Sequence, residues 1–376
     1  MSHDFQVSRP MVWNAALVPG SEMRRLGLRA SALALALVLG GCGASVGIGG
    51  GIGGGNSGGG GSVADVREAN VGDVAAVATD TLLAFGGPVR SLIDANLPPS
   101  AQRPRQGLMP NVLDLTEQFM SVRAPVTGVT ATGQQVMSGV LACTSGTGSV
   151  RAEFISAALI SLGDTLSIST QDCVMNGQRY SGSLSWRALG AGLGMPGVSS
   201  TWSARWSMAF SGWSQYDFIA PPIGLRAQGT VELKAQRFAP GDAEVQLTTR
   251  QANGQLYGLN LTLLEGTKLV SERDIVGVTG WRELAGSSYT SLDIVLTENF
   301  QASQGLSSIK VRTSGEASST AGGLPTGLWY AVAPDNSVAY VNSKTPTELL
   351  VQFSNSFGGN IVGSFLTTWP ELRRYL

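Results

Sequence analysis

From Val126 onward the apolar positions recur with a period of two, and Gly, Asn-Gly or Pro-Gly interrupts the chain about every eight to fifteen residues. This alternation is typical of antiparallel strands with one buried and one solvent-facing side. Roughly a dozen strands in about 250 residues predict a large curved sheet, half-barrel or barrel-like, because so many strands must curl, close or split. A β-sandwich is the alternative.

The clearest strand runs from Trp202 to Gly212, with its apolar side chains at every second position. Other segments alternate in the same way, at Tyr180, Leu184 and Trp186; Val231, Leu233 and Ala235; Val245 and Leu247; Leu292, Ile294 and Leu296; and Leu349, Val351 and Phe353. Trp186, Trp202 and Trp206 share the apolar phase and are expected in the core. Trp213 falls out of this phase and is the candidate exposed binding aromatic.

Residues that pair across two strands must share a face of the sheet, and along a strand the face alternates between odd and even residue numbers. This parity predicts the hairpin registers. A three-residue loop Ala252-Asn253-Gly254, with Gly254 left-handed, would pair Val245 with Leu261 and Leu247 with Leu259. The same parity at Met175-Asn176-Gly177 pairs Leu166 with Trp186 and Ile168 with Leu184.

Between Val231 and Arg250, parity places Leu233 and Leu247 on one face and requires an odd loop at Pro240-Gly241-Asp242. A five-residue loop is favoured because it sets Glu232 opposite Arg250; a three-residue loop would set it opposite Thr248.

The residues from 63 to 125 have helical spacing instead. A first helix carries Val74, Val77, Thr81, Leu82 and Phe85 and stops at Gly86-Gly87, and a second carries Val89, Leu92, Ile93 and Leu97. Asn111 is expected to cap a third. All three helices should pack on the sheet.

The segment Met23–Arg29 is basic, and Ala30–Leu39 is an apolar run too short to span a membrane, as in a secretory signal. Leu39-Gly40-Gly41-Cys42 follows and resembles the lipobox of bacterial lipoprotein precursors. The resemblance implies cleavage after Gly41, lipidation of Cys42 and, because Gly43 and not Asp follows, the outer membrane as destination. A glycine-rich tether continues to Ser62.

These features divide the chain into an upstream extension (1–22), a signal peptide (23–41), the lipidated Cys42 with its tether (42–62), a helical segment (63–125) and a β domain (126–376). The extension does not fit a signal, so translation is expected to begin at Met23. A curved sheet covered by helices would resemble half-barrel lipoproteins of the localisation-factor type, but no motif carries residue roles over from them.

Composition narrows the chemistry. The net charge is −1 and charged residues make up 14% of the chain, so no basic field favours nucleic acid. The single histidine, His3, precedes Met23, which argues against a catalytic imidazole or a His-rich metal site. No cofactor or metal is expected. Cys143 and Cys173 remain after lipidation of Cys42, and in an oxidising compartment they are expected to form a disulfide.

Carboxylates are the remaining candidates for catalysis, because two suffice for glycoside hydrolysis. They are scattered over the predicted strands, at Asp164, Asp172, Glu232, Glu244, Glu265, Glu283 and Asp293.

Taken together, these sequence features favour a non-enzymatic outer-membrane lipoprotein, facing the periplasm, with a structural or apolar-ligand (lipid) binding role. An envelope assembly or interaction factor that binds a protein partner is the alternative, and a carboxylate hydrolase of envelope glycans is the third hypothesis.

Overall fold

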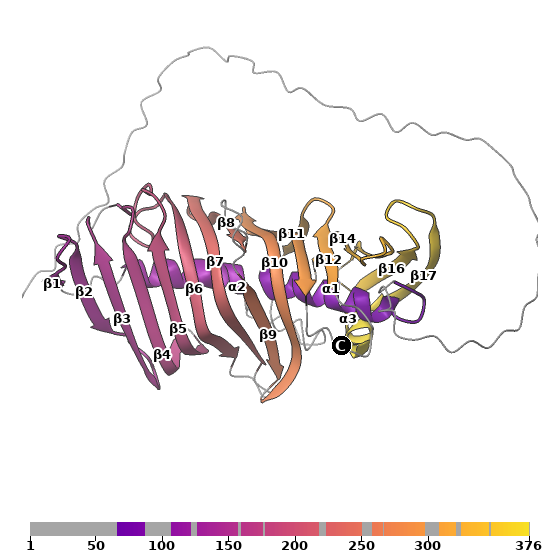
Figure 1. The fold of residues 1–376 in the computed structure, drawn as a ribbon, viewed down its shortest axis with the longest axis horizontal. Helices are drawn as coiled ribbons and strands as arrows, with labels where there is room; N and C mark the ends of the chain where they lie inside the picture. Colours follow the sequence, from indigo (N-terminus) through magenta and orange to yellow (C-terminus); the bar gives the residue numbers. More distant parts are fainter. Residues whose placement is uncertain are drawn as a thin grey trace, which may run out of the picture. The chain divides into compact units, whose positions relative to one another are not determined.

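The computed structural model describes residues 66–86, 107–121, 126–156, 159–175, 177–217, 223–249, 258–265, 267–297, 308–320, 325–345 and 347–375 (Figure 1). The helices are α1 (Val71–Gly86), α2 (Leu108–Ser121), α3 (Trp369–Leu372) and the 3-10 turn η3 (Arg373–Tyr375). The strands are β1 (Val126–Val129), β2 (Gln135–Val140), β3 (Thr147–Phe154), β4 (Thr165–Met175), β5 (Gln178–Ala188), β6 (Trp202–Asp217), β7 (Ile223–Ala239), β8 (Asp242–Thr248), β9 (Leu259–Glu265), β10 (Lys268–Leu284), β11 (Ser287–Thr297), β12 (Ser308–Thr313), β13 (Ala317–Thr320), β14 (Gly327–Val332), β15 (Val338–Ser343), β16 (Glu348–Ser354) and β17 (Ile361–Thr368).

All seventeen strands belong to one sheet, and every pairing is antiparallel. The prediction of a large antiparallel sheet is confirmed, and the β-sandwich alternative is wrong. Neighbours in sequence are neighbours in the sheet, except that β8 and β9 share the place between β7 and β10, and β12 and β13 share the place between β11 and β14. Among the described residues, β1 and β17 are the two edges of the sheet.

Helices α1 and α2 lie in one row that crosses the strands on one side of the sheet (Figure 1). We call this side the inner face and the opposite side the outer face. Gly107, just before α2, lies against the backbone of Phe85 at the end of α1. The first and third predicted helices are thereby confirmed, although α2 begins at Leu108. Asn111 is a buried residue inside its first turn and not its cap, because Pro110 is tolerated that early in a helix. The predicted helix Val89–Leu97 lies outside the described residues.

The strands β8 and β9 lie end to end and form one interrupted strand. Glu232 of β7 pairs with Thr248, and Gly229 of β7 pairs with Leu259. Three steps along β7 therefore correspond to eleven steps along the interrupted strand, an excess of eight residues. The chain between β8 and β9 is thus an insertion into a strand.

The predicted hairpin at Ala252-Asn253-Gly254 is wrong for this reason. Val245 pairs with Ala235, and Leu261 pairs with Ala227, so both residues face β7 and not each other. Two strands that lie end to end, such as β8 and β9, keep their apolar side chains on one face, as the two strands of a hairpin do. The odd or even numbering of the apolar positions therefore does not distinguish the two arrangements. Gly254 itself lies outside the described residues.

The register predicted for Leu166 and Ile168 is confirmed, and so is the prediction that Leu233 and Leu247 share a face of the sheet. Leu166 pairs with Trp186, Ile168 with Leu184, and Leu233 with Leu247. The turns themselves are shorter than parity suggests: Met175 pairs with Gln178, which leaves a loop of two residues. A β-bulge between Thr170 and Cys173 restores the parity that a three-residue loop would have given.

The turn after β7 is also shorter than predicted, and a bulge again compensates for the difference. Ala239 pairs with Asp242, and a bulge lies between Arg237 and Ala239. The favoured five-residue loop is therefore wrong, and Glu232 pairs with Thr248. Its carboxylate instead accepts a hydrogen bond from Arg205 Nε of β6 at 2.6 Å. Arg250 lies outside the described residues.

Glycines mark a line across the strands where the pairing is irregular. Gly182 of β5, Gly229 of β7 and Gly277 of β10 have positive φ, and a Cβ on each would overlap a carbonyl oxygen of the next strand or segment. Gly212 of β6 (φ 58°) belongs to the same line, because its backbone faces Gly182. We call these four glycines the bulge seam. Bulges bend strands, and bent strands are what an open sheet needs to curve around its helices.

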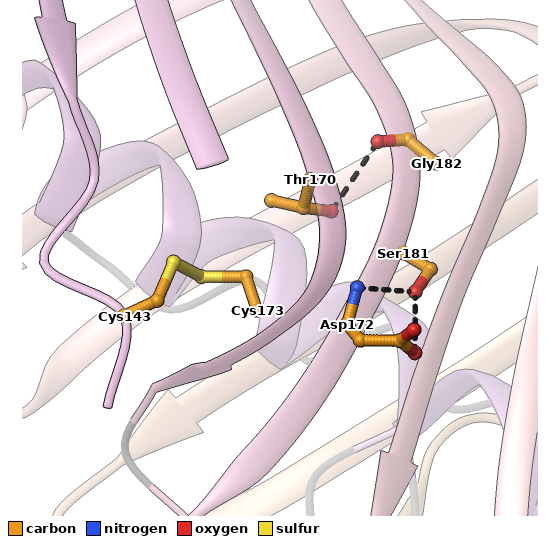
Figure 2. The surroundings of a disulfide bond; sticks show 6 residues. All are labelled: Cys143, Thr170, Asp172, Cys173, Ser181 and Gly182. Carbon is orange, nitrogen blue, oxygen red and sulfur yellow. Dashed lines mark hydrogen bonds between the residues drawn. A yellow bond between two sulfur atoms is a disulfide. The ribbon is translucent and has the colours of Figure 1, made fainter. Parts of the chain in front are cut away.

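The disulfide between Cys143 and Cys173 forms as predicted, with the two Cα atoms 5.2 Å apart (Figure 2). It joins the segment after β2 to β4 beside the bulge at Asp172. The Asp172 N–H donates to Ser181 Oγ at 2.9 Å, and the Ser181 hydroxyl donates to Asp172 Oδ1 at 3.2 Å (Figure 2). The cross-link and these bonds fix the irregular stretch of β4 against both neighbours.

The core lies between the inner face and the helices. In α1 nearly every described side chain is buried, with Asp73 and Val77 the partly exposed members. Six tryptophans are among its largest fully buried side chains: Trp186, Trp202, Trp206, Trp213, Trp329 and Trp369. In the described part of the chain the inner face is therefore filled by side chains.

Candidate functional site

Two loops at one end of the sheet are bonded to each other. They are 155–163, between β3 and β4, and 189–201, between β5 and β6. The Gly192 N–H donates to the Ile160 carbonyl at 2.9 Å, and the Gly163 N–H donates to the Ala188 carbonyl at 3.0 Å. We call the described residues of these two loops the apolar tip.

The apolar tip exposes aliphatic side chains and carries no charge. Neither loop contains an Asp, Glu, Lys or Arg residue. Leu193 is 73% exposed and Leu162 is 68% exposed. The exposed large hydrophobic side chains of the tip are Ile155, Leu159, Leu162, Leu189, Leu193 and Val198. Scattered single apolar residues are normal on a surface, but a contiguous group without charge indicates a contact site.

Buried anchors hold these loops in place. Ile160 and Met195 are buried, which ties each loop to the core. The buried carboxylate of Asp164 accepts hydrogen bonds from the N–H groups of Ile155 (3.0 Å) and Ser161 (2.7 Å). The conformation of the tip is thus fixed by backbone and carboxylate bonds, while its leucines point away from the core.

A cluster of ionisable groups lies at the base of the tip. Glu117 of α2 accepts hydrogen bonds from Arg237 Nη2 of β7 at 2.7 Å and from Trp202 Nε1 at 2.8 Å. Trp202 is the first residue of β6 and directly follows loop 189–201. Asp114 and Glu283 complete the group through their electrostatic interaction with Arg237. We call these four residues, Asp114, Glu117, Arg237 and Glu283, the carboxylate cluster.

The cluster contains a carboxyl group that titrates near neutrality. Although solvent still reaches Asp114, desolvation by the surrounding protein, followed by the charge of Glu117, raises its pKa from 3.8 to about 6, against the opposing effect of Arg237. Desolvation also raises the pKa of Glu283, and the Arg237 charge opposes that shift. The hydrogen bond to Glu117 raises the pKa of the Arg237 guanidinium.

Hydrolysis by two carboxylates needs one that donates a proton and one that is free to attack or to activate water. Asp114 has a pKa suited to the first role. Glu117 is not free for the second, because Oε1 accepts from Trp202 and Arg237 Nε and Oε2 accepts from Arg237 Nη2. Its geometry fits a structural link between α2 and the first residue of β6.

The carboxylates singled out in the sequence lie apart. Glu232 pairs with Arg205, and Asp293 pairs with Arg312 and Lys310. Glu244 accepts a hydrogen bond from Gln236. Asp164 and Asp172 bond to loop N–H groups and to Ser181, as described above, and Glu283 belongs to the carboxylate cluster. Glu265 lies at the end of β9, and its side chain is outside the described set.

The prediction that Trp213 is exposed is wrong, because it is 1% exposed. The register shift between Phe210 and Trp213 adds one residue to β6 and returns Trp213 to the inner face. There its ring stacks on Tyr180, with centroids 5.4 Å apart. Trp186, Trp202 and Trp206 are buried as predicted.

Two shallow hollows lie on the outer face. One, of about 300 Å³, has a mixed lining that includes Arg205, Lys234 and Gln246. The other, of about 180 Å³, is lined by serines of β3 to β6 together with Ile168, Leu184 and Ala209, and most of the surface that it exposes is apolar. Both hollows are open to solvent, whereas a pocket that binds an apolar ligand encloses most of it.

The described residues contain no group of three or more His, Cys, Asp or Glu side chains placed to hold a metal ion. No helix in the described ranges is long and apolar enough to cross a membrane. Gly41 and Cys42 lie outside the described residues, as does His3.

The apolar tip and the carboxylate cluster were not predicted from the sequence. A signal for the tip is present in FISAALISLG and LGAGLGMPGV, two long uncharged segments between polar strands. The cluster had no such signal, because its members come from α2, β7 and β10. Comparison with protein-family models, with curated proteins and with solved structures gives no match.

Proposed function

We propose that this chain is a non-enzymatic lipoprotein of the cell envelope, anchored in the outer membrane through Cys42, whose apolar tip binds the acyl-chain region of a lipid bilayer. The observation that carries the proposal is the exposure of six aliphatic side chains on two uncharged loops. A filled inner face in the described residues supports a lipid contact on the surface over one inside the sheet.

Energetics favour a lipid contact at the tip. Moving the exposed half of one Leu, Ile or Val side chain into hydrocarbon contributes roughly 1 kcal/mol. Six such side chains together contribute on the order of what one myristoyl chain contributes to membrane binding. A charged residue in either loop would offset much of this gain, and neither loop has one.

The composition of the tip favours lipid over a protein partner. The centres of protein interfaces are enriched in Trp, Tyr and Arg and carry directed hydrogen bonds. Neither loop contains an aromatic residue or an arginine. Aliphatic side chains alone suit acyl chains, which offer neither hydrogen-bonding groups nor a fixed shape.

Fluorescence quenching in vesicles tests the tip. The mature, lipidated Leu162→Cys protein is labelled with an environment-sensitive dye and reconstituted into vesicles that contain lipids brominated on their acyl chains. Because Cys42 is lipidated and the native disulfide occupies the other two cysteines, the thiol introduced at position 162 is the one that reacts with the dye. We expect quenching and a blue shift of the dye emission at position 162.

Val140→Cys is the matched control, because Val140 is 83% exposed and lies at the end of β2, away from the tip. We expect little quenching there. Equal quenching at positions 140 and 162, or none at 162, would overturn the lipid contact.

The anchor is tested separately. Cys42→Ala should accumulate unprocessed precursor and should not incorporate labelled fatty acid. A Cys42→Ala protein that is still labelled would exclude Cys42 as the lipidated residue.

A further inference from the structure

The last strand, β17, pairs with β16 along its whole length, from Glu348 opposite Thr368 to Ser354 opposite Ile361. Its other edge pairs with no strand among the described residues. An edge of this kind presents a row of backbone N–H and C=O groups that can pair with another strand.

Native sheets protect such edges with charged residues, prolines, bulges or very short strands. From Gly363 to Thr368, β17 has none of these, and no residue of the strand is charged. Leu366 is 74% exposed, and Val362 is 56% exposed. β17 has one register shift, between Gly363 and Ile361, and six regular residues beyond it, whereas β1 has four residues in all and a register shift between Val126 and Gly128.

We propose that β17 pairs with β17 of a second copy of this chain, antiparallel and about a two-fold axis at Ser364. The pairing joins two sheets into one continuous sheet and is independent of the lipid contact at the apolar tip.

Parity and side-chain matching select this register. Gly363, Phe365 and Thr367 of β17 pair with Phe353, Val351 and Leu349, which are buried on the inner face. Residues that pair across the two copies must share a face, so odd positions pair with odd positions. With Ser364 on the axis, Gly363 comes opposite Phe365 of the second copy, and Leu366 comes next to Val362, the residue at which the register of β17 shifts against β16.

This register covers the exposed apolar side chains twice, once on each side of the axis. A register centred on Phe365 would instead place Ser364 opposite Leu366 and Val362 opposite Thr368, leaving both apolar residues next to hydroxyl groups. Apolar cross-strand pairs stabilise a sheet, and an aromatic residue opposite a glycine shields the exposed backbone.

Charge and edge geometry identify the occupant as a second copy. Identical strands that face each other across a two-fold axis bring like residues together, and like charges there would be destabilising. An uncharged strand avoids this cost. The β1 edge offers only four irregular residues, so it cannot match the six regular residues of β17 from Gly363 to Thr368. Pairing of β17 with itself therefore closes at two copies.

Cross-linking tests the register. The full chain carrying Ser364→Cys, in detergent, should form a disulfide-linked dimer on mild oxidation, because directly opposed residues have Cβ atoms roughly 5 Å apart. Ser138→Cys, on β2 beyond Met137, the last residue there that pairs with β1, is the matched control and should not become cross-linked. A mixture of the two variants that links position 364 to position 138 would show head-to-tail pairing and overturn the two-fold proposal. Failure of Ser364→Cys to cross-link would overturn it as well.

Sedimentation provides an independent readout. The wild-type protein should sediment as a dimer in detergent, and Leu366→Lys should halve its mass by placing a charge beside the second copy. Leu366 is largely exposed, so the substitution should leave the fold intact, and its far-ultraviolet circular dichroism checks this. Val140→Lys, at the end of β2 and near the opposite edge of the sheet, should remain dimeric. A wild-type monomer, or dimers in both variants, would contradict the proposal.

Discussion

The carboxylate of Asp80 in α1 forms an ion pair with the guanidinium of Arg273 in β10. Both side chains are almost completely buried, at 1% and 6% exposure. Arg273 Nη1 also donates to Thr81 Oγ1 at 3.3 Å, and Ser271 Oγ donates to Asp80 Oδ2 at 3.4 Å. Asp80 Oδ1 has no hydrogen-bond partner within the described part of the chain. This polar group sits in an otherwise apolar layer and defines the position of α1 on the sheet.

Removing one member of this pair should be strongly destabilising. Asp80→Leu leaves the Arg273 charge buried without a counter-ion, so we expect the free energy of unfolding in urea to fall by about 3 to 5 kcal/mol. The double variant Asp80→Leu/Arg273→Met should lose less, because it removes both charges. A double variant less stable than Asp80→Leu would contradict this account. Arg151→Met at the largely exposed pair with Glu153 is the control and should cost about 1 kcal/mol or less.

The stability should also fall with rising pH because of Asp114. Folding raises the pKa of Asp114 from 3.8 to about 6, so the folded protein binds this proton more tightly than the unfolded chain. The resulting stabilisation is complete below about pH 4 and is lost as the pH rises through 6. Asp114→Asn should therefore flatten the pH dependence of the unfolding free energy between these values. An unchanged slope in the variant would contradict the assignment.

The bulge seam should tolerate no side chain at Gly182. This residue has a φ of 98°, and a Cβ there would overlap the Gly212 carbonyl. We expect Gly182→Ala to lower the unfolding free energy by roughly 3 kcal/mol or more, since strain and overlap add. Gly133→Ala is the matched control, with a φ of 83° and open space around it, and should cost only about 1 kcal/mol. Equal costs at the two sites would show that the close approach is unimportant.

The disulfide should contribute measurably to stability. Its cysteines are separated by 30 residues, and on the chain-entropy model a closed loop of this size stabilises the fold by about 3 to 4 kcal/mol. Cys143→Ala/Cys173→Ala should lose this amount in urea unfolding, and a reducing agent should destabilise the wild type by a similar amount. If the reducing agent also destabilised the double variant, the loss could not be assigned to this bond.

The sequence predicts the face of most strand residues because burial of one side of a sheet imposes a period of two. That Leu233 shares a face with Leu247, and Leu166 with Trp186, follows from that constraint, whereas the pairing of individual residues also depends on the length of the turn. The period fails at Trp213, where one extra residue at the seam reverses the phase. The period of two also does not distinguish a hairpin from an interrupted strand, which is why it leads to the wrong prediction that Val245 pairs with Leu261.

The candidate site was less predictable than the fold. Leu162 and Leu193 are exposed, whereas Ile160 and Met195 of the same loops are buried. All four side chains are apolar, so the sequence does not indicate which of them anchor the loops. The pKa of Asp114 depends on Glu117 and Arg237, and Arg237 lies more than a hundred residues away on another element. Local periodicity carries neither piece of information.

The packing of α1 determines the order in which the parts of this protein can assemble during synthesis. Each β-hairpin can form as soon as its second strand emerges, because sheet neighbours are sequence neighbours. Helix α1 emerges before all of them, yet Trp329 Nε1 of β14 donates to its Thr79 Oγ1, and the Val66 N–H just before it donates to Ser337 Oγ. Helix α1 must therefore wait, with its apolar surface uncovered, until the last third of the chain has followed it. During that interval the nascent protein is at its most vulnerable to aggregation and most dependent on chaperones.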